Sequence, residues 1–228
     1  VGVAGAVVAA LIADIFSWRT CYLIGGVMGL FLLALRVSTH ESELFQTLRA
    51  KPASGKSRGA IWMLFSSKDR FVRYLCCVLV GLPIWCAVGV IVTFSPEIGA
   101  ALGMSELPVA GTGIFYLYIG VTLGDFASGM ASQRWKSRRR AMFIFMLIMF
   151  CGALALLTIG GRSLTCFYGL AMLMGFGSGY WAVFVTTAAE QFGTNLRATV
   201  ATTVPNFVRG AVVPLTILFD SLRSSLGV

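Results

Sequence analysis

Seven apolar runs, separated by short polar segments, dominate the chain. They cover residues 1–16, 18–37, 71–95, 107–131, 141–160, 163–188 and 198–219. A helix rises about 1.5 Å per residue, so every run except the shorter first one can cross a hydrocarbon core about 30 Å thick. Lipid offers the backbone no hydrogen bonds, which favours helices over open strands. The pattern predicts an all-α, polytopic membrane helix bundle with about seven transmembrane helices.

The composition agrees with a membrane protein. Hydrophobic residues make up 57% of the 228 residues, charged residues make up 12%, and the mean hydropathy is +0.85. Soluble domains carry about 25% charged residues. The net charge of +9 comes from cations between apolar runs, and no polar basic domain carries base-stacking aromatics. We therefore expect a lipid bilayer as the environment and no nucleic-acid partner.

Few residues are suited to metal, redox or covalent chemistry. The six cysteines lie in or beside apolar runs without C-x-x-C spacing, which favours free thiols that pack as small apolar side chains. The one histidine, His40, lies in a polar segment. An integral-membrane enzyme would need a nucleophile with a base, or a set of metal ligands. We expect no cofactor, no metal site and no enzymatic activity.

Lysine and arginine set the expected orientation. Segment 132–140 carries five of them, and segment 96–106 carries none. Segment 38–73 carries seven: Arg49, Lys51, Lys56, Arg58, Lys68, Arg70 and Arg73. Because cations favour the inner side, we expect 38–70 and 132–140 to be cytoplasmic, in a plasma (inner) membrane. Segment 38–70 is the longest polar stretch, and we expect it to separate two membrane units and to end in a helix lying at the interface.

Two charged residues lie deep within apolar runs. Asp125 precedes Arg134 by nine residues, about 13 Å along a helix, and Arg209 follows Arg197 by twelve, about 18 Å. A charge at such depth is usually functional or paired. We expect either one ion pair between Asp125 and Arg209 or a proton carrier beside an anion-binding group. A pair that only joins two helices is the structural alternative.

The last run has a further polar feature. Pro205 and Pro214 flank Asn206 and Arg209, and proline permits a kink of the kind that lines cavities in membrane proteins. Aromatic side chains at mid-depth are candidates either to line a pathway or to pack in the bundle: Trp85, Tyr116, Tyr118, Tyr180 and Trp181.

Small residues recur four positions apart in several runs. The pairs are Gly25 with Gly29, Gly120 with Gly124, and Gly175 with Gly179. This spacing lets helices approach closely. It predicts tight packing and does not identify a function.

Charged residues also gather where runs end. Glu190 follows the end of run six and Arg197 precedes the start of run seven, on the same side of the bundle as Arg134 and Arg138. Ion pairs across these ends would break when the ends separate, so they can latch one conformation. The alternative is solvated surface charge that contributes little.

Three stretches together resemble the major facilitator superfamily of transporters. WRTCYLIGGVMGLFLLALRVSTHESELF is similar to the sixth helix and the acidic sequence after it in the sugar-porter and metabolite–proton symporter branch, where Glu41 and Ser42 match. AAEQFGTNLRAT is similar to the junction of helices ten and eleven, with Glu190 and Arg197 matching.

The third stretch, GMASQRWKSRRR, resembles the signature loop between helices eight and nine. Four residues fit that loop: Gly129, Arg134, Arg138 and Arg139. Gln133 replaces the usual acid, and Lys136 replaces the second glycine. The resemblance implies that Arg134, Arg138 and Glu190 form a cytoplasmic gate that closes in the outward-open state, with Arg139 and Arg197 beside it.

The resemblance also implies how the chain divides. The family has twelve helices in two six-helix halves. Residues 1–37 would end the N-terminal half, 38–70 would be the central cytoplasmic loop, and 71–228 would be the C-terminal half without its last helix. The chain would then be a fragment from the end of helix five to helix eleven, and helices one to four and twelve would be its missing partners.

The expected function is secondary active transport by alternating access. We expect proton-coupled symport of a small metabolite, and the deep Arg209 favours an anionic one. Asp125 and Arg209 are the expected centre, with Asn206, Tyr116, Tyr180 and Trp85 along the pathway. A uniporter or exporter of the same superfamily, and a transporter-like receptor or scaffold, stay open as alternatives.

Overall fold

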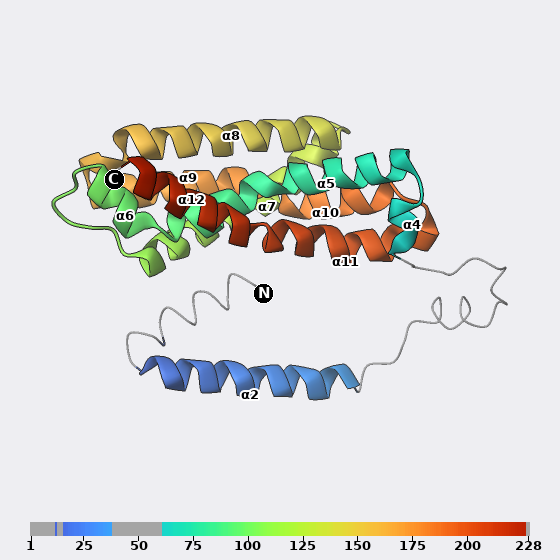
Figure 1. The fold of residues 1–228 in the computed structure, drawn as a ribbon, viewed down its shortest axis with the longest axis horizontal. Helices are drawn as coiled ribbons and strands as arrows, with labels where there is room; N and C mark the ends of the chain where they lie inside the picture. Colours follow the sequence, from blue (N-terminus) through green and yellow to red (C-terminus); the bar gives the residue numbers. More distant parts are fainter. Residues whose placement is uncertain (1–11, 13–15, 38–60, 227–228) are drawn as a thin grey trace. The chain divides into compact units, whose positions relative to one another are not determined.

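The computed structural model describes residues 12, 16–37 and 61–226. The chain divides into two compact units, Val1–Arg58 and Gly59–Val228, and each is described by itself. The described residues form helices and no strand (Figure 1). The division falls inside segment 38–70, and residues 38–60 lie outside the described part of the chain.

The first unit contributes one described spanning helix, α2, Trp18–Val37. Its segment Arg19–Arg36 is long and apolar enough to cross a membrane. Large apolar side chains such as Leu23, Leu30 and Phe31 are exposed along it, as lipid permits. The first apolar run, 1–16, falls almost entirely outside the described residues.

The second unit holds five more candidate spans (Figure 1). Its elements are α4 Trp62–Phe65, α5 Lys68–Cys86, the π-helix η1 Ala87–Val92, α6 Ser95–Ala101, α7 Ala110–Arg134, α8 Arg138–Ile159, the 3₁₀ turn η2 Gly160–Arg162, α9 Leu164–Ser178, α10 Trp181–Glu190, α11 Thr194–Gly210 and α12 Val212–Leu226. The six spans of the described residues correspond to runs two to seven, so the prediction of an all-α membrane helix bundle is confirmed.

The expected interfacial helix is shorter than its sequence suggests. Among the described residues of this segment, the four-residue helix α4 precedes α5 as a separate helix, with Trp62 exposed and Leu64 buried. The spanning helix α5 already begins at Lys68 and so includes the last three residues of the segment expected to be a loop. Since Asp69 lies in the first turn of α5, where a carboxylate favours the positive end of the helix dipole, the charged stretch 68–70 can start a helix.

Glycines bring α7 and α9 into backbone contact. A Cβ at Gly120 or Gly124 would overlap the carbonyl of Met172 or Phe176 on α9. A Cβ at Gly175 would overlap the carbonyl of Leu117 on α7. Predicted glycine pairs on two runs therefore meet each other, which is the close approach that small residues permit.

Two of the spans are discontinuous. Gly179 and Tyr180 separate α9 from α10, and Ala211 separates α11 from α12. Pro205 lies inside α11 without ending it, whereas the break at Ala211 falls just before Pro214, whose missing N–H cannot bond four residues back. Run seven is therefore interrupted next to its second proline and not at its first.

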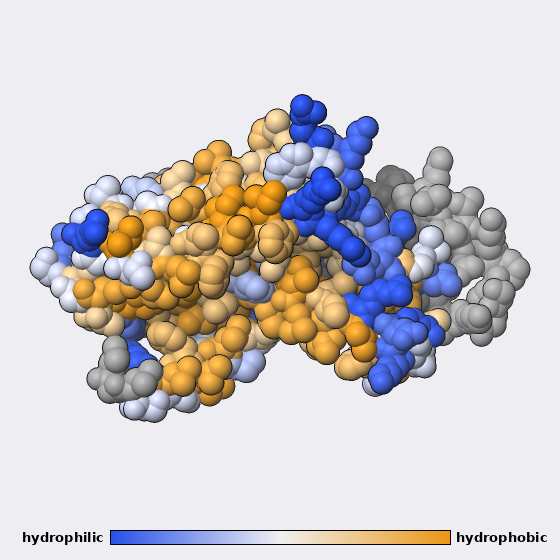
Figure 2. Space-filling view, turned by 90° about the horizontal axis from the view of Figure 1, so that it is seen from above, coloured by the Kyte–Doolittle hydropathy of each residue, from blue (hydrophilic) through white to orange (hydrophobic). Residues whose placement is uncertain are grey.

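Charged residues collect at one end of the second unit, where α7 and α10 finish and α8 and α11 begin (Figure 1). We name this end the basic end; it carries Arg134, Lys136, Arg138, Arg139, Arg140, Glu190 and Arg197. Figure 2, which looks onto α8, shows hydrophilic residues gathered beside a broad hydrophobic surface. Exposed apolar side chains of α8 include Phe143, Leu147 and Phe150, as expected for a helix in contact with lipid.

Candidate functional site

Asp125 of α7 meets the start of another helix. Its Oδ1 accepts a hydrogen bond from the backbone N–H of Ala182, at 3.3 Å. Ala182 is the second residue of α10, and the first N–H groups of a helix have no partner within that helix. A carboxylate satisfies such a group and favours the positive end of the helix dipole. Asp125 thus acts as an N-cap supplied by a different helix.

Ser128, one turn further along α7, forms a hydrogen bond on the α9 side of the same break. It is fully buried, and its hydroxyl donates to the carbonyl oxygen of Gly179, 2.5 Å away. The break also touches α7 directly, because a Cβ at Gly179 would overlap the backbone of Gly124 and Asp125. One face of α7 therefore fixes the end of α9 and the start of α10.

Arg209 of α11 reaches the same break by way of aromatic rings. Its guanidinium carbon lies 5.7 Å from the centre of the Trp181 ring and 5.8 Å from that of Trp85. The two rings meet edge to face, with centroids 6.4 Å apart. The Arg209 Nη1 is also 3.5 Å from Asn206 Oδ1. Such cation–π contacts hold a guanidinium without neutralising it.

The expected ion pair between Asp125 and Arg209 is not formed. Asp125 bonds to the backbone of Ala182, and Arg209 lies over Trp181 and Trp85. The salt bridge in the described part of the chain joins other residues, Arg138 and Glu190. The two deep charged residues lie at a similar depth but contact adjacent residues of α10 instead of each other. The N-terminus of α10 satisfies Asp125, and two aromatic faces satisfy Arg209.

Two tyrosines expected along the pathway have other surroundings. Tyr180 is completely buried, and its hydroxyl donates to the Val80 carbonyl at 2.8 Å. In this conformation it joins α5 to the break and lines no open path. Tyr116 stacks on Tyr168, with ring centroids 5.4 Å apart. It precedes Asp125 by nine residues on α7, about 13 Å along the helix, and so lies away from the break.

At the basic end, Arg138 and Glu190 form an ion pair between α8 and α10. Arg134, Arg139 and Arg197 are exposed and make no ion pair within the described residues. The structure thus brings together one of the pairs expected at the gate and leaves the remaining cations at the surface.

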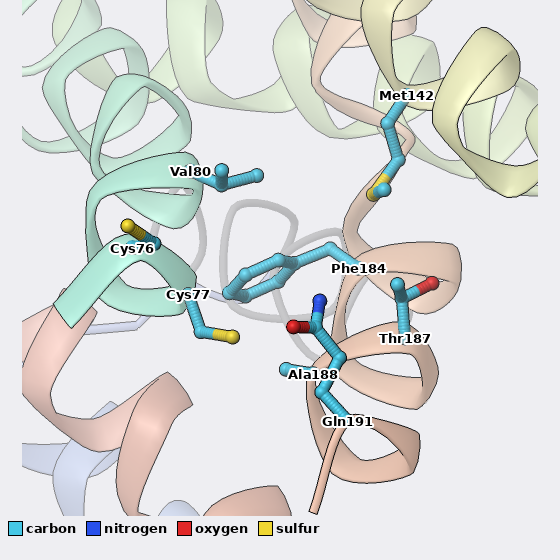
Figure 3. Close-up of a pocket in the computed structure, with 8 residues that line it drawn as sticks. All are labelled: Cys76, Cys77, Val80, Met142, Phe184, Thr187, Ala188 and Gln191. Carbon is cyan, nitrogen blue, oxygen red and sulfur yellow. The ribbon is translucent and has the colours of Figure 1, made fainter. Parts of the chain in front are cut away.

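Three hollows lined by described residues lie near this site. The smallest, about 90 Å³, lies between α5, α8 and α10 and is lined by Cys76, Cys77, Val80, Met142, Phe184, Thr187, Ala188 and Gln191. Figure 3 shows the Phe184 ring reaching across it from α10 toward α5. At about 30 Å³ per water, it has room for a few waters and not for a metabolite.

A larger groove, about 710 Å³, runs between α5 and α11. Its walls are Leu75, Val78, Leu79, Leu82, Thr203, Asn206, Phe207, Gly210 and Ala211. Its polar side chains are Thr203 and Asn206, and Asn206 also contacts Arg209. The third hollow, about 490 Å³, lies at the basic end. No group of three potential metal ligands occurs among the residues that the structure describes.

The sequence contains signals for parts of this site that were not predicted. Ser128 follows Asp125 by three residues, so the two share a helix face. The Gly177-Ser178-Gly179 stretch marks a weak point in run six. The partner of Asp125 is a backbone N–H, which no side-chain pattern reveals.

Discontinuous helices and deep charged groups in a bundle of candidate spans define a multi-pass membrane protein with features typical of transporters. The profile of the Major Facilitator Superfamily matches residues 1–213. The chain therefore belongs to that superfamily, and it is a membrane transporter in the general sense. No curated protein and no solved structure matches the chain.

Proposed function

We propose that the protein is a proton-coupled symporter of a small organic anion. The observation that carries this proposal is the meeting of two deep charged residues at one helix break. Asp125 holds the N–H of Ala182, and Arg209 lies over the ring of Trp181. A proton on one and an anion on the other would act on the same hinge.

Arg209 is the proposed anion-binding group. It is exposed and has no acidic partner in the described residues. A guanidinium presents a planar fork of donors that suits a carboxylate, and its ring contacts fix its orientation in advance. Asn206 and the groove between α5 and α11 supply a further polar group and an apolar wall. A small carboxylate with an apolar portion fits this arrangement.

Asp125 is the proposed proton-responsive group. It forms no salt bridge within the described residues, and its carboxylate accepts a hydrogen bond from the Ala182 N–H. As an anion it stabilises the positive end of α10, and a protonated carboxyl loses most of that charge–dipole attraction. Protonation therefore weakens the contact that holds the start of α10 against α7. Anion binding engages Arg209, whose guanidinium lies over the side chain of the first residue of α10. Bending at a discontinuous helix is a recognised way to alternate access.

The ion pair of Arg138 with Glu190 is the proposed gate. It joins the start of α8 to the end of α10, so a tilt of α10 would separate its members. Its side chains are 43% and 50% exposed, and an exposed pair contributes about 0–1 kcal/mol. A latch of this strength can bias a conformation without locking it. We place the basic end at the cytoplasmic side because of its cations.

The test is uptake by the full-length protein in proteoliposomes under an inside-alkaline pH gradient. Labelled organic acids, sugars and amino acids are screened with Asp125→Asn and Arg209→Gln. The matched controls are Asp220→Asn and Arg162→Gln, which remove the same charges outside the site. We expect uptake of an acid that Asp125→Asn uncouples from the gradient, and about tenfold weaker binding in Arg209→Gln, as for one lost charged hydrogen bond.

Three results would contradict the proposal. Unchanged gradient-driven uptake in both variants would make the two residues structural. Uptake that ignores the gradient would indicate a uniporter. Transport of neutral solutes alone would remove Arg209 as an anion site.

A further inference from the structure

The hollow at the basic end is lined by three elements. Its walls are Gly129, Ser132 and Gln133 of α7, Lys136, Ser137 and Arg138 at the turn into α8, and Ala182, Val183 and Thr186 of α10. Its volume is about 490 Å³. It is polar at the turn, and it reaches Ala182 at the break without including Arg209.

The turn beside this hollow carries uncompensated positive charge. Of the five cations in 134–140, Arg138 pairs with Glu190. The other four, Arg134, Lys136, Arg139 and Arg140, form no ion pair within the described residues. Gln133 on the wall is neutral. The hollow therefore favours an anion.

An apolar strip continues from the hollow toward the middle of the membrane. Gln133 is preceded on the same face of α7 by Met130 and Phe126, at spacings of three and seven residues. Met130 is 57% exposed and Phe126 73% exposed. Trp135, also exposed, lies beside Lys136, as aromatics do at membrane interfaces. Figure 2 shows that, on the face it views, hydrophilic surface adjoins a broad hydrophobic surface.

We propose that this hollow binds the phosphate of an anionic phospholipid, with an acyl chain along Met130 and Phe126. Basic pockets between transmembrane helices bind anionic headgroups in this way. A free phosphate would use the cations but not the apolar strip. The observed combination of a charged hollow and an exposed strip favours the lipid.

The site has a consequence for the gate, and this part rests on the proposed function. Arg138 lines the hollow and also pairs with Glu190. A bound phosphate competes with Glu190 for that guanidinium and weakens the link between α8 and α10. Anionic lipid would then favour separation of these helix ends. Lipid binding itself can be measured without any transport assay.

The experiment is a titration of the purified full-length protein in detergent with fluorescent phosphatidylglycerol and, separately, phosphatidylcholine. Lys136→Asn removes a wall cation at a residue whose φ of 49° suits asparagine. Lys68→Asn is the matched control at the start of α5. We expect phosphatidylglycerol to bind preferentially, and Lys136→Asn to weaken it about fivefold, as for one lysine near an anionic surface. Lys68→Asn should bind as the parent does.

A second variant tests the hollow itself and keeps every charge. A Cβ at Gly129 would meet no heavy atom within 4 Å, so Gly129→Leu fills space without a backbone clash. We expect this variant to lose its binding of phosphatidylglycerol. If the variant does not fold, the comparison of the two lysine variants tests the proposal. Equal binding of the two lipids, equal effects of the two lysine variants, or full binding by folded Gly129→Leu would overturn the proposal. Displacement of the lipid by millimolar inorganic phosphate would overturn it in favour of a free anion.

Discussion

Replacing Ser128 by alanine tests whether α7 holds the break between α9 and α10. Ser128 is fully buried, and its hydroxyl donates to the carbonyls of Gly179 and Asp125. Alanine removes the hydroxyl and adds no bulk. The Gly179 carbonyl then loses its hydrogen bond from Ser128. Because α9 has already ended there, no helical hydrogen bond replaces it.

The expected cost follows from that lost bond. Leaving a buried acceptor unsatisfied costs about 1–3 kcal/mol, while hydrogen bonds between membrane helices average about 0.6 and reach about 1.7 kcal/mol. Because Gly179 is buried against α7 and away from lipid, we expect about 1–2 kcal/mol. If the break opens locally, the amide exchange rate at Ala182 rises by about 5–30-fold.

The assay is hydrogen exchange by mass spectrometry on the full-length protein in detergent, following a peptide that spans 176–186. Ser132→Ala is the control, since this serine lies one turn further along α7 and makes no hydrogen bond to the break. Asp125→Asn, which keeps an acceptor for the Ala182 N–H, should have a smaller effect than Asp125→Ala. Unchanged exchange in Ser128→Ala, or an increase spread evenly over the chain, would refute the reasoning.

Three other substitutions have defined outcomes. Gly124→Ala places a Cβ against a carbonyl of α9 and should lower the free energy of unfolding by about 3 kcal/mol or more, measured by denaturant titration; a cost below 1 kcal/mol would contradict the contact. Glu190→Gln should change stability by less than about 1 kcal/mol yet alter the transport rate, and equal rates would remove the pair with Arg138 as a gate. Trp181→Leu should weaken anion binding about fivefold through the lost ring contact with Arg209, and unchanged affinity in a binding titration would contradict this.

The apolar pattern was sufficient to predict the helices, because length and hydropathy alone decide whether a segment can cross lipid. Runs two to seven each correspond to a span among the described residues. The glycine pairs predicted tight packing, and the structure shows that Gly120 and Gly124 meet α9. The sequence could not name that partner, since spacing within a helix does not say which helix lies opposite.

The candidate site was predictable only in part. Counting residues from the basic edge placed Asp125 and Arg209 deep in the bundle, but depth leaves open the direction in which each side chain points. The break at Gly179 and Tyr180 creates free backbone N–H groups, and one of them bonds to Asp125. Of the two arrangements that the sequence left open for Asp125 and Arg209, the ion pair is therefore the one that is not formed.

The sequence by itself determined the class of this protein: an all-helical membrane bundle with cations collected at one end. It did so because the bilayer acts on each segment separately through hydropathy and charge. Only the tertiary structure decided that Asp125 caps α10, that Ser128 holds the end of α9, and that Arg209 rests on two tryptophans. These contacts depend on how helices far apart in the sequence are rotated against one another, and packing alone sets that rotation.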